Sequence, residues 1–236
     1  MKKILTTLFS LVILFTCFGS TSYAVNTCSY EEKNICKTIT ITGDLSDSST
    51  YVDKVERLLA DPYVEHVIVI DPSRYITPLN ENSQPNNSLT SHGRPYYTYR
   101  ITNPRIGSDY IGSTRIATAG GQPGETLSIS KTSTVSRTYY CSVSAISPSS
   151  ITSAVGYDVT SSDSIQISGS RTVPSYHNGR AVAKMYLDAY PIYQTTNFTV
   201  QRKKHYNLVP YEWENYGSGY ARHPYGVSFS ERYIYR

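Results

Sequence analysis

Residues Thr126 to Val173 read TLSISKTSTVSRTYYCSVSAISPSSITSAVGYDVTSSDSIQISGSRTV. In the first half, small hydroxyl residues occupy the even positions from Ser128 to Thr138, and most odd positions are apolar. After Ser147-Pro148-Ser149 the alternation starts again and continues to Val173. Because successive side chains of a strand point to opposite faces, each half predicts a strand with one apolar and one polar face. Two such strands around a Pro-Ser turn predict a long antiparallel hairpin.

The hairpin pattern resembles the membrane-inserting hairpins of aerolysin-like β-pore-forming toxins. In that family, hairpins of neighbouring subunits join in a closed barrel with apolar side chains toward lipid and hydroxyls toward water. The resemblance implies insertion of residues 126–173 and assembly of a homo-oligomer. The candidate lipid-facing residues are Val135, Val143, Ile151, Val155, Val159 and Ile165.

Four charged residues depart from this pattern, because Lys131, Arg137, Asp163 and Arg171 fall on the otherwise apolar positions. A charge that faces lipid near the midplane costs about 2–4 kcal/mol. An inserted hairpin must therefore place these residues near the interfaces or shift its phase by a bulge. The alternative is a soluble antiparallel sandwich with a Ser/Thr-rich outer face, and the sequence favours this alternative.

The first 24 residues have the pattern of a secretory signal peptide. Lys2 and Lys3 precede an apolar run, and Ser22 and Ala24 fit the cleavage site. The apolar run is shorter than the roughly 20 residues of a membrane-spanning helix. We therefore expect a secreted, extracellular protein that is cleaved after Ala24.

The segment that follows predicts a small α/β unit over residues 25–72. An alternating strand begins at Lys37, a helix capped by Ser49 or Thr50 runs to Ala60, and the apolar strand 64–70 completes the unit. Residues 73–95 are rich in Pro, Asn and Ser and predict a loop or linker. The remainder, 96–236, predicts one β-rich domain, with strands at 96–101, 181–190 and 197–202 besides the hairpin. The predicted fold class is therefore mainly β, an antiparallel sheet or sandwich with a small N-terminal α/β element.

Tyrosine is unusually frequent toward the C-terminus, where it alternates with glycine. Aromatic rings with polar tips suit interfaces that are apolar at one end and wet at the other, although tyrosine is also a common strand residue. The candidate ligand-binding residues are Tyr211, Trp213, Tyr216 and Tyr220. These rings could stack on sugars of a cell-surface glycan or lie at a membrane surface.

Motifs for catalysis, cofactors and metals are absent from the sequence, so we assign no catalytic residue, no metal ligand and no cofactor. Glu212 and Glu214 flank Trp213 and form a candidate acid–base pair for a cell-wall or glycan hydrolase, although two carboxylates on one strand are also typical of a solvated edge. Removing Lys2 and Lys3 lowers the formal charge from +4 to +2, which disfavours a nucleic-acid partner.

Three cysteines remain after the predicted cleavage. Cys28 and Cys36 are close in sequence and form a candidate disulfide, which would leave Cys141 unpaired. Three cysteines allow three single-bridge pairings, and the sequence does not choose among them. Cys141 beside a histidine is a candidate nucleophile, although its place in an alternating strand favours a structural thiol.

A second resemblance rests on Val155-Gly156-Tyr157-Asp158-Val159-Thr160, the Ser-rich run to Thr172-Val173-Pro174, Gly179, and Tyr186 to Tyr193. This layout is similar to uncharacterised small exported proteins of Gram-positive bacteria. The resemblance implies export and β-structure and supplies no residue roles.

The sequence favours a secreted, non-enzymatic interaction protein that binds a cell-surface glycan, a membrane or a protein partner. The first alternative is a β-pore-forming protein that inserts the 126–173 hairpin, and the second is a cell-wall or glycan hydrolase.

Overall fold

The structure is a computed structural model that describes residues 38–61, 63–78, 96–206 and 209–236. It is mainly β with a small α/β element, which confirms the predicted fold class. The elements are β1 (Thr38–Thr42), the 3-10 helix η1 (Ser48–Thr50), α1 (Val52–Ala60), β2 (His66–Ile70), the 3-10 helix η2 (Pro72–Arg74), β3 (Tyr96–Ile106), β4 (Tyr110–Ile111), β5 (Ala117–Gly121), β6 (Thr126–Ser136), β7 (Thr138–Cys141), α2 (Pro148–Val155), β8 (Ser162–Thr172), β9 (Tyr176–His177), β10 (Arg180–Tyr206) and β11 (Val209–Tyr235).

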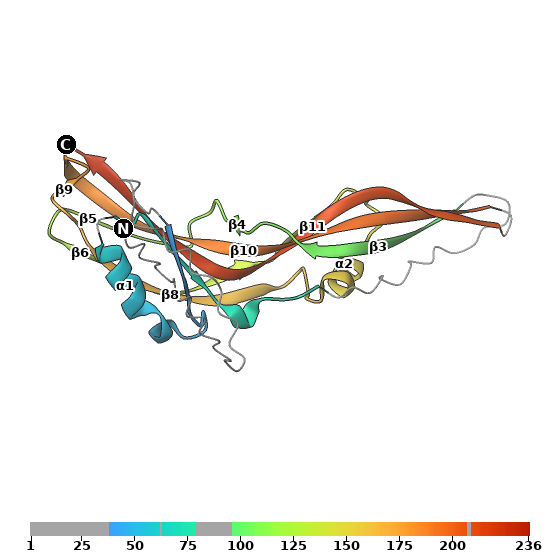
Figure 1. Cartoon of the computed structure of the whole chain (residues 1–236), viewed down its shortest axis with the longest axis horizontal. Coiled ribbons are helices and arrows are strands. Elements are labelled where there is room, and N and C mark those ends of the chain that lie inside the picture. The colour runs from blue at the N-terminus through green and yellow to red at the C-terminus, as the bar shows by residue number, and fades with distance from the viewer. Residues whose placement is uncertain (1–37, 62, 79–95, 207–208) are drawn as a thin grey trace, which may run out of the picture.

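Two strands of 27 residues each, β10 and β11, form the spine of the molecule and pair antiparallel along their whole length. At about 3.3 Å per residue each strand spans roughly 90 Å. Figure 1 shows the resulting elongated outline, with α1 near one end and the C-terminal part of β10 at the other. The main sheet has the order β1-β2-β11-β10-β3, and the short strands β4, β5, β7 and β9 pair with the spine.

The continuous strand β10 corrects the prediction of two shorter strands at 181–190 and 197–202. Pro191 stays in the ladder opposite Val227, and a bulge after Ile192 absorbs the irregularity. The sequence pattern is interrupted at this point, but the hydrogen-bonded strand is not.

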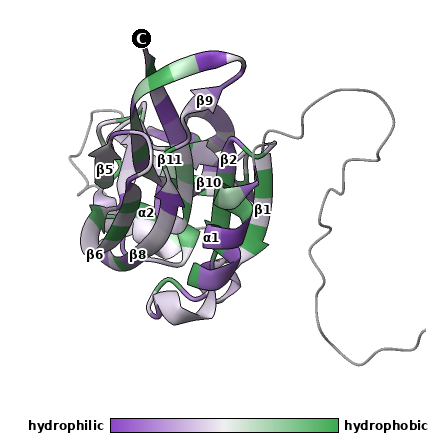
Figure 2. Cartoon of the chain, turned by 90° about the vertical axis from the view of Figure 1, so that its left-hand side faces the viewer, coloured by the Kyte–Doolittle hydropathy of each residue, from purple (hydrophilic) through white to green (hydrophobic). Residues whose placement is uncertain are grey.

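The N-terminal strand–helix–strand unit forms and joins the main sheet, but the predicted helix cap at Ser49 or Thr50 is wrong. Both residues lie in η1, which Asp47 caps, and α1 begins after Tyr51 without a side-chain cap. β1 pairs parallel with β2, which in turn pairs antiparallel with β11. Figure 2 looks from this end of the molecule and shows α1 beside β1 and β2. The apolar stripe of α1 buries Val55 and Leu59. The predicted linker lies mostly at 79–95, outside the described residues, so the division into domains stays a prediction.

The predicted hairpin is correct at its base and wrong at its tip. β6 and β8 form a separate two-stranded antiparallel sheet in which Thr126 pairs with Thr172 and Ser136 with Ser162. This register is centred on Ser149, where the sequence predicts the turn. The last backbone bond in this register joins the Arg137 N–H to the Ser161 carbonyl at 3.0 Å. The residues between these two leave the ladder, because β7 pairs with β11 and residues 148–155 form the helix α2.

The Ser-Pro-Ser segment starts a helix instead of making a tight turn. The Ser147 hydroxyl accepts a hydrogen bond from the Ser150 N–H at 3.3 Å, and Pro148 occupies the first helical turn, where proline is well tolerated. Gly156, with φ of +85°, ends the helix in the left-handed conformation.

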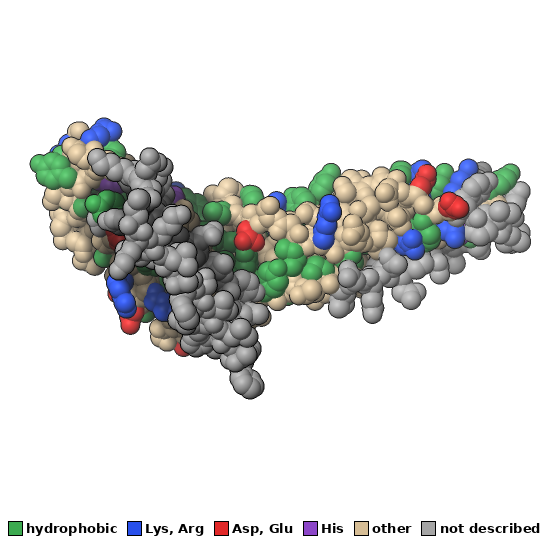
Figure 3. All heavy atoms as spheres, viewed as in Figure 1, with side chains coloured by type: hydrophobic (Ala, Val, Ile, Leu, Met, Phe, Trp, Pro, Cys, Tyr) green, Lys and Arg blue, Asp and Glu red, His purple; other side chains and the backbone are tan. Residues whose placement is uncertain are grey.

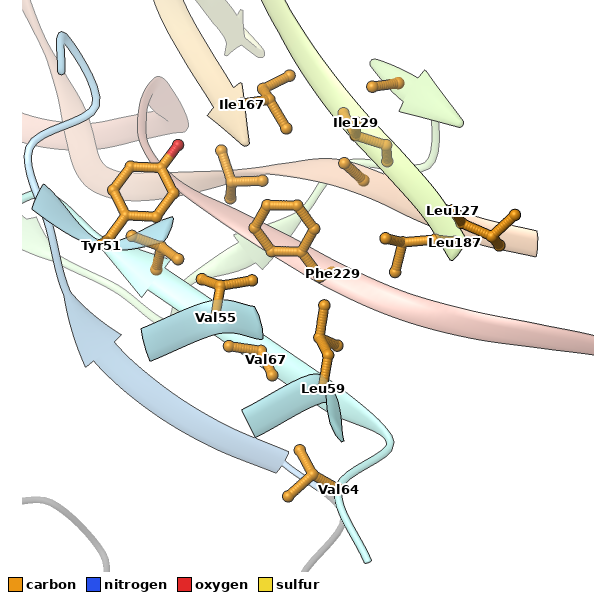
Figure 4. Close-up of a cluster of buried hydrophobic side chains, with 14 of the residues drawn as sticks. Tyr51, Val55, Leu59, Val64, Val67, Leu127, Ile129, Ile167, Leu187 and Phe229 are labelled. Atoms are coloured by element: carbon orange, nitrogen blue, oxygen red, sulfur yellow. The ribbon is translucent and has the colours of Figure 1, made fainter. Parts of the chain in front are cut away.

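Two hydrophobic cores lie along the spine. The first core packs α1, β2, β6 and β8 against β10 and β11, and Figure 4 shows it around Phe229. We call the part of the molecule around this core the broad half. The second core lies where α2 covers β3, β10 and β11. We call the part of the molecule around this second core the narrow half. Burial of each large apolar side chain contributes about 1.5–3 kcal/mol. The second core contains Ile101, Val143, Ile146, Ile151, Ala154, Val155, Tyr157, Val159, Phe198, Val200 and Ala221.

Candidate functional site

The β6–β8 sheet has the amphipathic character that its sequence predicts. Leu127, Ile129 and Ile167 point into the first core and are at most 5% exposed. The opposite face of β6 exposes Ser128, Ser130, Thr132 and Thr134. Two of the predicted apolar-face residues, Val135 and Ile165, also lie in the first core. The base of the hairpin therefore has one buried apolar face and one solvent-facing hydroxyl face.

The other four predicted hairpin residues do not share this face. Val143, Ile151, Val155 and Val159 lie in the second core, to which Ile151 and Val155 belong as residues of α2 itself. They belong to the segment that leaves the ladder, and Val159 is only 1% exposed.

The charges on the apolar positions of the hairpin are held by ion pairs at its ends. Arg137 Nε lies 2.8 Å from Asp163 Oδ2, and hydrogen bonding to this carboxylate raises the pKa of Arg137. At the other end Arg171 Nε lies 2.8 Å from Glu231 Oε1. Burial raises the pKa of Glu231, because both side chains of the pair are almost covered. Lys131 lies midway and is exposed.

The outer edge of β8 is covered by the N-terminal unit. The Gln166 N–H donates to the Leu45 carbonyl at 2.8 Å, and the Tyr51 hydroxyl donates to the Gln166 carbonyl at 2.6 Å. Arg74 Nη2 donates to the Ser164 carbonyl at 3.0 Å. Burial raises the pKa of Tyr51 to about 12, so its hydroxyl remains a donor. Backbone groups that would otherwise form an open sheet edge are thereby satisfied.

The predicted aromatic ligand residues do not form one site. The Trp213 ring lies 4.2 Å from the Arg100 guanidinium, whereas the Tyr216 ring lies 4.0 Å from that of Arg202. Lys203 also lies over the Trp213 ring. Because Arg202 and Lys203 are successive residues of β10, their side chains point to opposite faces of the sheet. The rings that they contact, Tyr216 and Trp213, therefore lie on opposite faces as well.

The remaining two ligand candidates are separate from Trp213 and Tyr216. Tyr220 lies further along β11 and contacts Tyr140 and Arg222. Tyr211 falls at a β11 position whose side chain is outside the described residues. Sequence patterns do not single out Arg100, Arg105 and Arg222, which lie in the narrow half. The strand register identifies them, because β3 and β11 pair with β10 on its two sides and bring these three residues beside it.

Figure 3 shows basic side chains spaced along the narrow half, with fewer acidic ones on the side in view. Among the acidic residues, Glu214 Oε1 lies 2.6 Å from Arg202 Nη2, and both Glu212 and Glu214 are exposed. The proposed acid–base pair therefore lies on an open strand surface.

The remaining chemical candidates have these positions. Cys141 has a free, half-buried thiol whose pKa is raised by burial, so the reactive thiolate is less populated. Cys28 and Cys36 lie outside the described residues. Within the described residues, no three His, Cys, Asp or Glu side chains lie close enough to share a metal ion. None of the helices in the described part of the chain is long and apolar enough to cross a membrane.

Comparisons with known proteins give little beyond this geometry. No protein-family model matches the chain, and no curated protein matches it. A solved structure described as that of the parasporin-2 Bacillus thuringiensis toxin that recognizes cancer cells is 13% identical. The similarity covers 60% of this chain and 73% of that chain, with a TM-score of 0.16. A TM-score this low does not establish a shared fold.

Proposed function

We propose that this chain is a secreted protein that perforates membranes, and that residues 137–161 enter the lipid as an extension of the β6–β8 hairpin. The observation that carries this proposal is the register of β6 and β8, which is centred on Ser149. Continued inward, the same register would place Tyr139 opposite Val159 and Val143 opposite Val155.

The inward extension keeps the alternation of the base. Tyr139, Cys141, Val143 and Ala145 fall on the apolar parity of the first arm. On the second arm the same parity contains Ile151, Val155, Tyr157 and Val159. The segment therefore has two compatible structures, which are β7 with α2 in the monomer and a hairpin tip in lipid.

Three of the four charges that oppose insertion, Lys131, Asp163 and Arg171, lie outside residues 137–161, and the fourth, Arg137, is the first residue of this segment. The arms 138–147 and 151–160 contain no charged residue on the apolar parity, because Lys131, Arg137, Asp163 and Arg171 all belong to the base or its boundary. Each arm has about the 9–11 residues that a tilted membrane-spanning strand requires. The 2–4 kcal/mol cost of a lipid-facing charge is thereby avoided.

The monomeric structure of the tip is weakly specified. Apart from Pro148 and Ala154, every residue of α2 is Ser, Thr or β-branched, and these types have below-average helix propensity. The strand β7 has only four residues. The apolar side chains on the lipid-facing parity, such as Val143, Val155 and Val159, would move from the second core into lipid, so their burial is exchanged and not lost. Ile146 and Ala154 lie on the other parity and would lose their burial. Unpaired backbone groups in lipid are costly, so several copies must join edge to edge.

The test is dye release from lipid vesicles by residues 25–236, with a reversible lock on the tip. Tyr139 and Ala221 are directly opposed on β7 and β11, and opposed Cα atoms lie about 4.5–5.5 Å apart. A disulfide accepts about 4.4–6.8 Å. We therefore join Tyr139→Cys to Ala221→Cys in a Cys141→Ser background.

The locked protein is expected to release no dye until reductant is added, whereas each single-cysteine variant releases dye in both conditions. Release by the locked protein without reductant would disprove insertion of residues 137–161. Absence of release by the unmodified chain across anionic and zwitterionic vesicles would disprove perforation.

A further inference from the structure

One face of the sheet in the narrow half is basic and polar. Along β10, Phe198 and Val200 point into the second core beneath α2. Asn197, Thr199 and Gln201 alternate with them and therefore point to the opposite face. We call this opposite face, between Thr195 and Lys203, the basic face.

Strand register adds residues from both neighbours of β10 to the basic face. On β3, Arg105 pairs with Asn197 and Arg100 with Gln201. On β11, Arg222 pairs with Thr195 and Trp213 with Lys203. Four cations therefore lie on one face, namely Arg222, Arg105, Arg100 and Lys203.

Three of these cations, Arg222, Arg100 and Lys203, contact aromatic rings or a side-chain amide. The Arg222 guanidinium lies 3.8 Å from the Tyr110 ring and 4.3 Å from the Tyr220 ring. The Arg100 guanidinium donates from Nε and Nη2 to the Gln201 side-chain carbonyl, at 3.0 and 2.8 Å. Ring contacts restrict a guanidinium without neutralising it.

The positive charge of the basic face is not compensated. None of its four cations forms an ion pair with any carboxylate of the described residues. On the opposite face, by contrast, Arg202 is paired with Glu214. The basic face is therefore suited to a partner that carries negative charge.

The cations follow the strand direction and flank a hollow. From the register position of Thr195 to that of Lys203 the face extends about 26 Å at 3.3 Å per residue. Between Arg222 and Arg100 lies a depression of about 350 Å³ that Arg105, Asn197, Thr199, Ser218, Tyr140 and Tyr220 help to line. Its polar lining consists of amide and hydroxyl groups and the guanidinium of Arg105.

We propose that the basic face binds a linear sulfated glycan. Side-chain amides and hydroxyls between cations suit a partner that is both anionic and rich in hydroxyl groups. The four cations are spread far more sparsely than nucleic-acid phosphates, which recur about every 3.4 Å along a strand. The rings of Trp213 and Tyr220 are already covered by cations, which disfavours base stacking. The strip offers little aliphatic surface, which a lipid interface would require.

The test measures binding of the full chain to heparin in 150 mM salt and in the absence of membranes. Binding is expected to shift the emission of Trp213, the single tryptophan of the chain, because its ring lies on the basic face. The double variant Arg105→Ala/Lys203→Ala should lose at least tenfold in affinity. The control Lys54→Ala/Arg57→Ala removes two exposed charges from α1 and should change the affinity less than twofold.

Three outcomes would overturn the proposal. They are equal binding by the double variant, equal binding of desulfated heparin, and equally tight binding of single-stranded DNA. Circular dichroism of each variant excludes loss of folding as the cause of weaker binding. Because no membrane is present, failure of glycan binding and failure of perforation are separate results.

Discussion

His223 is a buried polar residue at the junction of three elements. Its side chain is 2% exposed, its Nε2–H donates to the Arg74 carbonyl at 2.7 Å, and its ring lies 4.6 Å from that of Tyr157. Burial lowers the pKa of His223. The hydrogen bond to the Arg74 carbonyl raises the pKa of His223 in part. The positive charge of Arg137 lowers this pKa further, and the negative charge of Asp163 raises it by less. The native state therefore holds a neutral imidazole.

We predict a pH-dependent loss of stability that depends on His223. A histidine with a lowered native pKa contributes stability above its unfolded pKa of about 6.5, and this stability is lost as the pH falls through the native pKa. The slope is at most about 1.4 kcal/mol per pH unit for one proton. Urea unfolding between pH 7.5 and 5.5 should show a smaller decrease for His223→Leu than for the unmodified chain, whatever their absolute stabilities. Parallel curves would contradict the prediction.

At the scale of elements, one carboxylate connects the N-terminal unit to β8. Asp71 is 2% exposed, and its Oδ2 accepts from the Leu45 N–H and from Arg74 Nε, both at 3.0 Å. Leu45 and Arg74 in turn bond to the backbone of β8 at Gln166 and Ser164. The edge of the hairpin base therefore depends on Asp71.

Asp71→Asn should uncover this edge. The amide puts a donor where the carboxylate accepts, so we expect a loss of about 2–4 kcal/mol in the free energy of unfolding. Hydrogen exchange at residues 164–168 should accelerate even under native conditions. Asp53→Asn, the same change at an exposed position of α1, should alter exchange little. Unchanged protection of the Gln166 amide in Asp71→Asn would refute this role.

Elements with a regular period could be predicted from the sequence, and elements set by single side chains could not. The alternation of β6 and β8, and the stripe of α1, are repeated over enough residues to determine strand, helix and register. For residues 137–161 the same alternation coexists with a helix signal, because Ile151, Ala154 and Val155 also have helical spacing. The aromatic site was predicted from composition alone, and composition does not specify the face on which Trp213 or Tyr216 lies.

At the scale of the molecule, β10 and β11 are the elements that the two cores share within the described part of the chain. Leu187 and Phe229 lie in the first core, whereas Val200 and Ala221 lie in the second, on the same pair of strands. Continuous hydrogen-bonded ladders couple the two regions mechanically. Loss of packing in one core should therefore be transmitted along the spine.

Trp213 makes this coupling measurable, because it lies near the start of β11 and Phe229 lies near its end. Phe229 is fully buried in the first core, and Phe229→Ala should cost about 3–5 kcal/mol. If the spine unfolds as one unit, the denaturant midpoint of Trp213 fluorescence should fall together with that of far-UV circular dichroism. Val200→Ala, in the second core, should also move both midpoints together. If Phe229→Ala moved the dichroism midpoint and left that of Trp213 unchanged, the narrow half would unfold independently. Refolding of residues 137–161 would then be a local event that leaves the first core intact.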